Sequence, residues 1–440
     1  MTRVLLIGNG AREHALAEAL VKGGAELCAF MSKRNPGIAK LCNDNVKLGD
    51  LTNFSEISTF GKKNKVEFAV VGPEAPLAVG IVDGLKIQGI PTVGPTIECA
   101  QLESSKIFAR ELLKKHNIES NINFETFIKM DGIPEFVAKI GKENVVVKPD
   151  GLTGGKGVKV WGDHLHSEEE IYDYCQEIFN HNGRVVIEEK LEGEEFTYIC
   201  FVDGDHVVGT PLVQDNKRAY NGDKGPNTGG MGSISYENHL LPFVNANDVE
   251  YARLQLEKVV KSVHLETGVK YKGFLYGQFM KTKKGTKVVE FNIRFGDPEA
   301  MNILPIIKSN FVEICQRILN GTLQSNIEFE NKATVCKYLV PEGYPTNPKA
   351  NSEIQIDKEG LNKIGAKIYY ASVSEEDGKI FTSTSRAIAV LGIADSIEEA
   401  EEIAENATQY IHGELFHRTD IGTQALINQR VQHMWEILRN

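Results

Sequence analysis

The alternation of short apolar strands and helices in the first hundred residues most constrains the fold of this chain. Strands are predicted over 3–7, 27–31, 68–71 and 91–95, one helix begins at Glu13 and another spans 81–88. Strand–helix–strand units at this spacing are typical of a doubly wound parallel sheet. Two turns rich in glycine or proline, 8–10 and 72–77, directly follow strands. Ligands of such sheets bind at the carboxyl ends of the strands, so both turns are candidate binding segments.

From about residue 104 the pattern changes to a mixture of helices and strands. We expect α/β structure in the first part and mixed α/β and α+β structure in the rest. The expected domains are 1–103, 104–323 and 324–440, and a subdomain is expected at about 122–190. The expected helices are 106–115, one from Ser167, 248–266 and 396–410. The expected strands are 145–148, 158–161, 184–189, 196–202, 206–209, 273–280, 287–291, 335–339, 367–373 and 387–393.

Composition narrows the function classes. The length of 440 residues suits about three domains of roughly 150 residues. A net charge of 49 − 60 = −11 argues against nucleic acid as the main partner. The apolar runs are only a few residues long, against the ~18 that a membrane span needs, and the N-terminus lacks a signal-peptide pattern. Seven scattered cysteines without a C-x-x-C pair favour a reducing cytoplasm.

The first glycine turn, at 8–10, differs from a dinucleotide-binding turn. Glu13 stands where that motif needs a small residue, and Lys33 and Arg34 stand where a ribose-binding acid is expected. The glycines still allow a backbone to approach a phosphate at a helix N-terminus. The turn is therefore either a phosphate site or a tight turn without a ligand.

A second glycine-rich segment, 148–158, combines lysines with glycines between two strands. No Ser or Thr follows Lys156 and a strand follows the loop, so this is not a Walker A motif. Backbone N–H groups and lysines here indicate a flap over a polyphosphate, with an ordinary hairpin as the alternative. The strand at 184–189 then runs into acidic residues. That segment is either a solvated turn or a hinge whose backbone binds adenine while Glu195 binds a ribose.

The most specific pattern is the strand that contains Glu290, Asn292 and Arg294. Alternate residues of a strand share a face, so these three side chains lie together, opposite the apolar residues 289, 291, 293 and 295. Carboxylate and amide oxygens suit Mg²⁺ or Mn²⁺ on phosphates, and Gln278 on the preceding strand adds another oxygen. Arg294 suits a transferring phosphoryl group. The alternative is a polar face in contact with solvent.

The polar segments 214–218 and 225–232 form a long glycine-rich region between predicted strands. Long loops of this kind are usually functional or disordered. This region is either an active-site loop that binds a carboxylate substrate through Lys217 or Arg218, or a mobile surface loop.

Together these motifs resemble a known family. The strings at 8–14, 71–77, 154–157, 214–218, 225–232 and 290–299 are similar to those of the phosphoribosylamine–glycine ligases of the ATP-grasp superfamily. The resemblance runs in the same order from residue 3 to about 425, where 418–422 matches the family's C-terminal end. The strings 225–232 and 290–299 are specific to this ligase family, whereas the glycine flap alone indicates only an ATP-grasp protein.

The resemblance implies an N-terminal α/β domain, a two-subdomain ATP-grasp core and a C-terminal domain. It implies that ATP drives the ligation of glycine to 5-phosphoribosylamine through glycyl phosphate. It also implies Mg²⁺ or Mn²⁺ as the metal ion, small molecules as the partners and a monomeric protein. The implied catalytic residues are Arg294, Asp215 and Lys217, and the implied metal ligands are Gln278, Glu290 and Asn292. The implied nucleotide-binding residues are Lys106, Lys148, Gly151, Gly155, Lys156, Gly157, Glu188, Glu189, Leu191 and Glu195. The implied substrate-binding residues are Asn9, Gly10, Glu13, Glu74, Arg218, Asn227, Thr228, Gly229, Gly230 and Asp297.

The sequence departs from the family pattern in places. Gln278 stands where many ATP-grasp enzymes have a metal carboxylate, and 382–386 replaces a Gly-Gly-Arg turn. Ala11 replaces a glycine and Pro149 an alanine. Two other functions are compatible with the motifs: a different ATP-grasp carboxylate ligase or carboxylase, and a nucleotide-binding module without catalysis.

Overall fold

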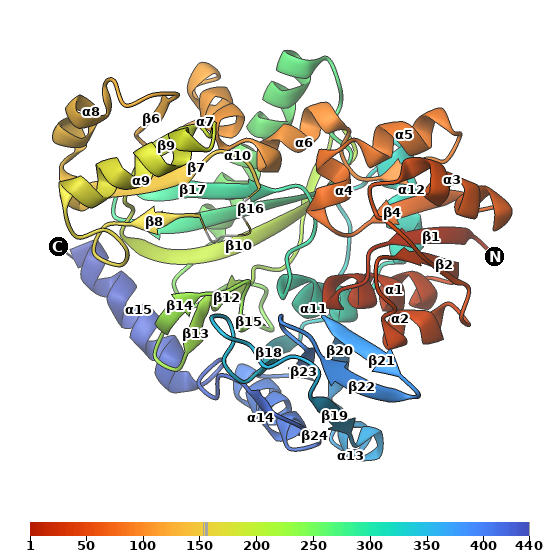
Figure 1. The fold of residues 1–440 in the computed structure, drawn as a ribbon. Helices are drawn as coiled ribbons and strands as arrows, with labels where there is room; N and C mark the ends of the chain where they lie inside the picture. Colours follow the sequence, from red (N-terminus) through yellow and green to blue (C-terminus); the bar gives the residue numbers. More distant parts are fainter. Residues whose placement is uncertain (153, 155–156, 440) are drawn as a thin grey trace.

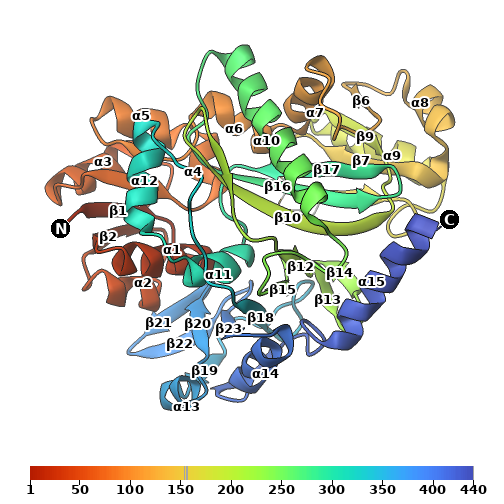
Figure 2. The ribbon, with the colours of Figure 1, turned by 180° about the vertical axis from the view of Figure 1, so that it is seen from behind.

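The first part of the chain forms a parallel sheet in the order β3-β2-β1-β4-β5, with helices on both sides (Figures 1 and 2). The computed structural model describes residues 1–152, 154 and 157–439. Residues 4–7 are fully buried, which explains why this strand is continuously apolar rather than alternating. The strands are β1 Arg3–Ile7, β2 Glu26–Met31, β3 Val46–Leu48, β4 Phe68–Val71 and β5 Thr92–Val93. The helices are α1 Ala11–Lys22, α2 Pro36–Leu41, α3 Phe54–Lys63, α4 Glu74–Ala78, α5 Ile81–Ile87 and α6 Ile97–Ser104.

An antiparallel sheet in the order β6-β9-β7-β8 has its own small hydrophobic core. Its helix α9 begins after Ser167, whose hydroxyl accepts from the Glu170 N–H, and three glutamates in the first turn favour the helix dipole. The strands are β6 Phe124–Phe127, β7 Val145–Pro149, β8 Lys159–Val160 and β9 Val185–Glu189. The helices are α8 Ile133–Ile140 and α9 Glu168–Asn180.

A second antiparallel sheet has the order β11-β10-β16-β17 and lies next to the antiparallel sheet β6-β9-β7-β8 (Figure 1). Its strands are β10 Gly193–Val202, β11 Val207–Gly209, β16 Gly273–Thr282 and β17 Gly285–Asn292. The helices of this part are α7 Lys106–Lys115, α10 Ala246–Thr267, α11 Glu299–Ile303 and α12 Phe311–Asn320. The 22-residue helix α10 begins with a capping box between Asn245 and Asp248.

The C-terminal part forms a larger antiparallel sheet together with strands from the middle of the chain. This sheet contains β12 Gln214–Asp215, β15 Gly232–Ser235, β18 Ala333–Pro341, β20 Lys367–Tyr370, β23 Ile388–Ala394 and β25 Leu415–Phe416. Smaller pairings use β13 Arg218–Tyr220, β14 Lys224–Asn227, β19 Glu353–Ile356, β21 Val373–Glu376, β22 Lys379–Thr382 and β24 Ile411–His412. The helices are α13 Lys358–Lys363, α14 Ile397–Thr408 and α15 Gln424–Arg439, which packs against β10 and β16.

The predicted fold class is confirmed, and several local predictions need correction. The single strand predicted at 367–373 divides at residues 371 and 372 into β20 and β21, which join different sheets. The region 214–232, predicted as a loop, contains short strands, because Arg218 and Tyr220 pair with β14 across a turn. The strand predicted at 91–95 shrinks to two residues between its prolines. Helix α15 was not predicted. Within the described residues, no helix is long and apolar enough to cross a membrane.

Candidate active site

A cavity of about 670 Å³ lies where the parallel sheet, the two antiparallel sheets and the 214–232 region meet. It brings together residues far apart in the sequence, from Arg12 near the N-terminus to Arg386 in the C-terminal part. Most residues with a predicted role line it: Lys106, Lys148, Gly151, Glu188, Glu189, Leu191, Glu195, Asp215, Lys217, Thr228, Gly229, Glu74, Glu290, Asn292, Arg294 and Asp297. The sequence motifs therefore converge on one site.

Other residues with a predicted role lie outside the cavity lining. Asn9 ties the end of β1 to Ser32, whose N–H and hydroxyl donate to the Asn9 Oδ1. Gly10 is the N-cap of α1, and its N–H donates to Oε2 of Glu13 in the first turn at 2.6 Å. Gly157, Arg218, Asn227, Gly230 and Gln278 are also not among the lining residues. Gly155 and Lys156 lie outside the described residues.

At the end of the cavity next to α7, β7 and β9, a buried carboxylate binds two cations. Arg110 on α7 donates to both oxygens of Glu188, at 2.7 and 3.2 Å, and Lys148 Nζ lies 2.7 Å from Glu188. All three side chains are at most 7% exposed. Burial alone would raise the pKa of Glu188, but Arg110 and Lys148 lower it to about 2. The Glu188 side chain therefore orients Lys148 rather than a ligand.

Lys106 and the segment after β9 complete this end of the cavity. Lys106 Nζ donates to the Gly151 carbonyl at 2.6 Å, next to the glycine flap, and burial lowers its pKa. The Glu189 and Lys190 N–H groups donate to Asn123 and Asn144 carbonyls. Among the described residues, the Leu191 N–H has no protein acceptor. This amide is therefore available to a ligand in the cavity.

The side chains of the predicted metal face, Glu290, Asn292 and Arg294, line the cavity, but the strand that carries them differs from the prediction. A bulge at Val289 shifts the register between β16 and β17, so Val288 rather than Val289 is buried and Val289 lines the cavity. The predicted apolar face is wrong at this position. Strand β17 ends at Asn292, so Arg294 lies beyond it. All three polar side chains still reach the cavity.

The residues of this face suit a hard divalent cation. Within the described residues, the side chains of Glu290 and Asn292 have no hydrogen bond or ion pair, and no cluster of three or more His, Cys, Asp or Glu residues forms an all-protein metal site. Mg²⁺ is usually bound by one or two carboxylates together with substrate phosphates, and these two residues match that arrangement. Gln278 differs, because it is fully buried and its Oε1 accepts hydrogen bonds from Thr197, at 3.0 Å, and Tyr276.

Arg294 is fixed by carboxylates on two sides. Its Nε donates to Glu74 at 3.1 Å and its Nη2 to Glu103 at 3.0 Å. Despite burial, Arg294 and Arg12 lower the pKa of Glu74 to about 2, whereas burial raises the pKa of Glu103. A guanidinium has five N–H donors, and a third goes to the Phe295 carbonyl. Two donors remain for an anion in the cavity.

The third charged group is the Lys217–Glu195 pair. Lys217 Nζ lies 2.7 Å from Glu195 Oε2, which also accepts from Gln278 Nε2 at 2.8 Å. Burial lowers the pKa of Lys217, but Glu195, Asp215 and Glu290 outweigh this effect and raise it well above its usual value. Lys217 therefore remains protonated beside the metal face.

Sequence reasoning missed several residues that line the cavity: Arg12, Glu103, Tyr276, Glu299 and Arg386. Glu299 Oε1 lies 2.9 Å from the Tyr276 hydroxyl oxygen. Burial, followed by the charge of Asp215, raises the pKa of Glu299 to about 7. The sequence could have indicated two of them, because Arg12 lies in the motif 8–14 and Glu299 in the motif 290–299. Arg386 ends the divergent 382–386 segment, and Glu103 and Tyr276 had no signal.

Comparison with known proteins agrees with this arrangement. The model of the phosphoribosylglycinamide synthetase ATP-grasp (A) domain matches residues 104–300, which places the chain among the ATP-grasp enzymes. The N-domain model of the same family matches residues 2–103 and the C-domain model 334–424. The chain therefore belongs to the phosphoribosylglycinamide synthetase family, also called phosphoribosylamine–glycine ligases. The resemblance inferred from the motifs is confirmed.

Curated and solved relatives extend over nearly the whole chain. Phosphoribosylamine–glycine ligase of Methanocaldococcus jannaschii is 49% identical over 99% of this chain and all of that protein. The Methanosarcina barkeri ligase is 50% identical over 99% of both chains. The crystal structure of the Thermotoga maritima ligase has a TM-score of 0.80 and 30% identity, covering 96% of this chain and 100% of that one. The biotin carboxylase domain of a Hydrogenobacter thermophilus 2-oxoglutarate carboxylase, at 15% identity, shares the fold with a TM-score of 0.71, covering 99% of this chain and 94% of that one.

Proposed function

We propose that this chain joins glycine to 5-phosphoribosylamine, giving glycinamide ribonucleotide, ADP and phosphate through glycyl phosphate, in de novo purine biosynthesis. One observation carries the proposal: a single cavity is lined by Lys106, Lys148 and the fixed Arg294, and by Glu290 and Asn292, which have no partner among the described residues. These groups suit the activation of a carboxylate by ATP. Membership of the ligase family supports glycine and the ribosylamine as the substrates.

The nucleotide end of the cavity binds ATP. Lys106 and Lys148 compensate phosphate charge, and the Leu191 N–H with the Glu189 backbone meets the adenine. Glu195 meets the ribose, and the glycine flap with Gly151, Gly155, Lys156 and Gly157 covers the phosphates. Glu188 acts indirectly, through the 2.7 Å contact that orients Lys148.

The metal ion is proposed to be Mg²⁺ or Mn²⁺ held by Glu290 and Asn292. When bound, such an ion bridges phosphate oxygens and spreads the charge that develops during phosphoryl transfer. Gln278 is the weakest candidate ligand, because its oxygen already accepts two hydrogen bonds from buried hydroxyls. Gln278 is better placed to orient Glu195, to which its Nε2 donates.

The reaction has two steps. A glycine carboxylate oxygen attacks the γ-phosphorus and ADP leaves; the amine nitrogen of the ribosylamine then attacks the carbonyl carbon, phosphate leaves and the nitrogen loses a proton. Arg294 and Lys217 orient the glycine carboxylate and the acyl phosphate, because both cations lie on the cavity wall, and Asp215 faces glycine beside them. The cavity excludes water from an intermediate that hydrolyses readily.

The ribosylamine is proposed to bind at the other end of the cavity, near Glu74, Thr228, Gly229 and Asp297. Asn9, Gly10, Glu13, Arg218, Asn227 and Gly230 support this end from outside the lining. Arg218 forms an ion pair with Asp163, a residue of the lining, and so links the 214–232 region to the segment after β8. We also propose a cytoplasmic monomer without nucleic-acid or membrane partners, and the domains 1–103, 104–323 and 324–440.

Phosphate release from ATP and Mg²⁺ tests the proposal. With freshly made 5-phosphoribosylamine, release should require glycine, and alanine, β-alanine or bicarbonate should not replace it. Release with another acid or with bicarbonate instead would indicate a different ATP-grasp ligase or carboxylase. ATP binding without release under any of these conditions would indicate a nucleotide-binding module.

A further inference from the structure

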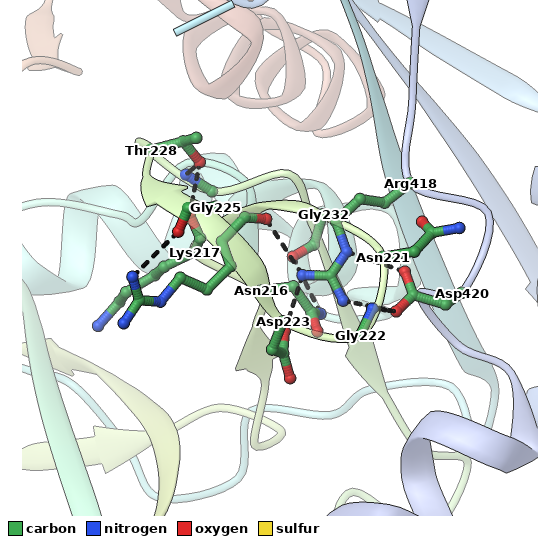
Figure 3. Close-up of polar contacts among 12 residues, drawn as sticks. Asn216, Lys217, Asn221, Gly222, Asp223, Gly225, Thr228, Gly232, Arg418 and Asp420 are labelled. Carbon is green, nitrogen blue, oxygen red and sulfur yellow. Dashed lines mark hydrogen bonds and ion pairs between the residues drawn. The ribbon is translucent and has the colours of Figure 1, made fainter. Parts of the chain in front are cut away.

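The end of the chain binds the segment that carries Lys217. Arg418 is 1% exposed, although it follows the last strand of the C-terminal sheet. Figure 3 shows its guanidinium between Asp223 and Asp420: Arg418 donates to Asp223 at 2.7 Å and to both Asp420 oxygens at 2.8 Å. A further hydrogen bond goes to the Arg218 carbonyl at 3.1 Å. A buried arginine thus holds the start and the turn of the hairpin 218–227.

Neighbouring hydrogen bonds also connect the residues after Arg418 to the turn of this hairpin. The Gly222 N–H donates to Asp420 at 2.8 Å (Figure 3). Asn221 donates to the Thr419 hydroxyl at 2.8 Å and accepts from the Thr419 N–H at 3.2 Å. Residues 419 and 420 therefore bind the hairpin tip through backbone and side chain together.

Helix α15 adds a contact next to Lys217 itself. Arg430 Nη2 donates to Asn216 Oδ1 at 2.6 Å and to Asp223 Oδ2 at 3.0 Å. Asn216 is 3% exposed, lies between Asp215 and Lys217, and pairs through its backbone with Gly232 and Met231. Arg430 thus binds the residue that separates two of the proposed catalytic residues.

The same helix also contacts the partner of Lys217. Arg430 lies 3.8 Å from Glu194, and His433 Nδ1 lies 2.6 Å from the other Glu194 oxygen. Glu194 precedes Glu195, whose carboxylate binds Lys217 Nζ. Helix α15 therefore contacts the residue next to each member of the Lys217–Glu195 pair, from the side away from the cavity.

We propose that Arg430 and Arg418 are positioning residues that fix Lys217 for the glycine carboxylate and Asp215 beside it. The inference rests on the proposed function. Neither arginine lines the cavity, so each acts through residues 216 and 223. Lys106 and Lys148, proposed to bind ATP, lie on α7 and β7, and within the described residues neither arginine makes a hydrogen bond or an ion pair with these elements. Loss of Arg430 should thus affect glycine strongly, and ATP only weakly, through the ribose contact proposed for Glu195.

Steady-state kinetics of Arg430→Met test whether the effect on glycine is separate from the effect on ATP. A small displacement of positioned groups can cost about 10- to 100-fold, so kcat/KM for glycine should fall by about this factor, while the KM for ATP stays within about twofold. Arg430→Lys keeps one charged donor and should recover part of the loss. Arg253→Met is the matched control, because Arg253 also binds two carboxylates but on α10, away from the 214–232 region.

Asp223→Asn provides a second variant that keeps the side-chain shape and weakens both arginine contacts. It should show the same separation, and hydrogen exchange of the peptide 214–232 should speed up in both variants while that of 145–149 is unchanged. Equal changes in the KM values for glycine and ATP, or wild-type kinetics and exchange, would overturn the positioning role. A wild-type protein without glycine-dependent phosphate release would overturn the proposed function instead.

Discussion

Replacing Glu188 by glutamine should cost a large part of the stability, because the Glu188 carboxylate is buried between two cations. The substitution keeps the shape of the side chain and removes its charge, which leaves Arg110 and Lys148 buried without a counterion. A pKa that falls from 4.5 to about 2 on folding corresponds to about 3 kcal/mol of stability at neutral pH, at about 1.36 kcal/mol per pH unit. We expect Glu188→Gln to lower the free energy of unfolding by about this amount.

The stability contribution of Glu188 should depend on pH in a defined direction. Because the folded pKa lies below the unfolded one, the contribution of Glu188 is complete above pH 4.5 and disappears as the pH falls toward 2. The difference between wild type and variant should therefore shrink from about 3 kcal/mol at pH 7 to about 1 kcal/mol at pH 3.

Urea unfolding followed by far-UV circular dichroism at both pH values measures this difference. Glu189→Gln is the control, because its side chain is only half-buried; a change at such a surface position is usually within about 0.5 kcal/mol. A Glu188→Gln variant as stable as wild type at pH 7, or a difference that is the same at pH 3, would refute the reasoning.

Two further predictions concern the cavity. Glu290→Gln should lower turnover by orders of magnitude with an unchanged circular dichroism spectrum, because one proposed metal ligand loses its charge; near-normal turnover would exclude that role. Glu299→Gln should be more stable relative to wild type at pH 8 than at pH 5: burial raises the pKa of Glu299 to about 7, so the wild type loses stability as the pH rises from 4.5 through 7. Melting temperatures at the two pH values test this, and a constant difference would contradict it.

The sequence predicted the parallel sheet and the main motifs because their signals are local. The apolar run of β1 and the spacing of the first helices reflect burial on both faces of one sheet. Helix α7 was predicted at its observed limits, 106–115, because its apolar periodicity is regular. Glu290 and Asn292 were grouped correctly, because alternation in a strand fixes which side chains share a face, whereas Arg294 reaches the same cavity from beyond the end of the strand.

The missed features depend on tertiary structure. The bulge at Val289 exchanges the roles of two adjacent valines, and no local pattern marks it. The Glu188 side chain could not be assigned from its acidic neighbours, because its partners Arg110 and Lys148 are 78 and 40 positions away. Helix α15 and Arg418 reach the 214–232 region across about 200 residues. Long-range ion pairs of this kind leave no periodic signal in the sequence.

The most direct test of the central claim follows the carboxylate oxygens of glycine. If glycine labelled with ¹⁸O in its carboxylate reacts through glycyl phosphate, the released phosphate carries one ¹⁸O atom, and the amide product retains the other. Mass spectrometry of phosphate and product after incubation with ATP, Mg²⁺ and 5-phosphoribosylamine measures both. The account predicts ¹⁸O in the phosphate and a product mass equal to the ribosylamine joined to glycine. Unlabelled phosphate, or a product without glycine, would contradict it.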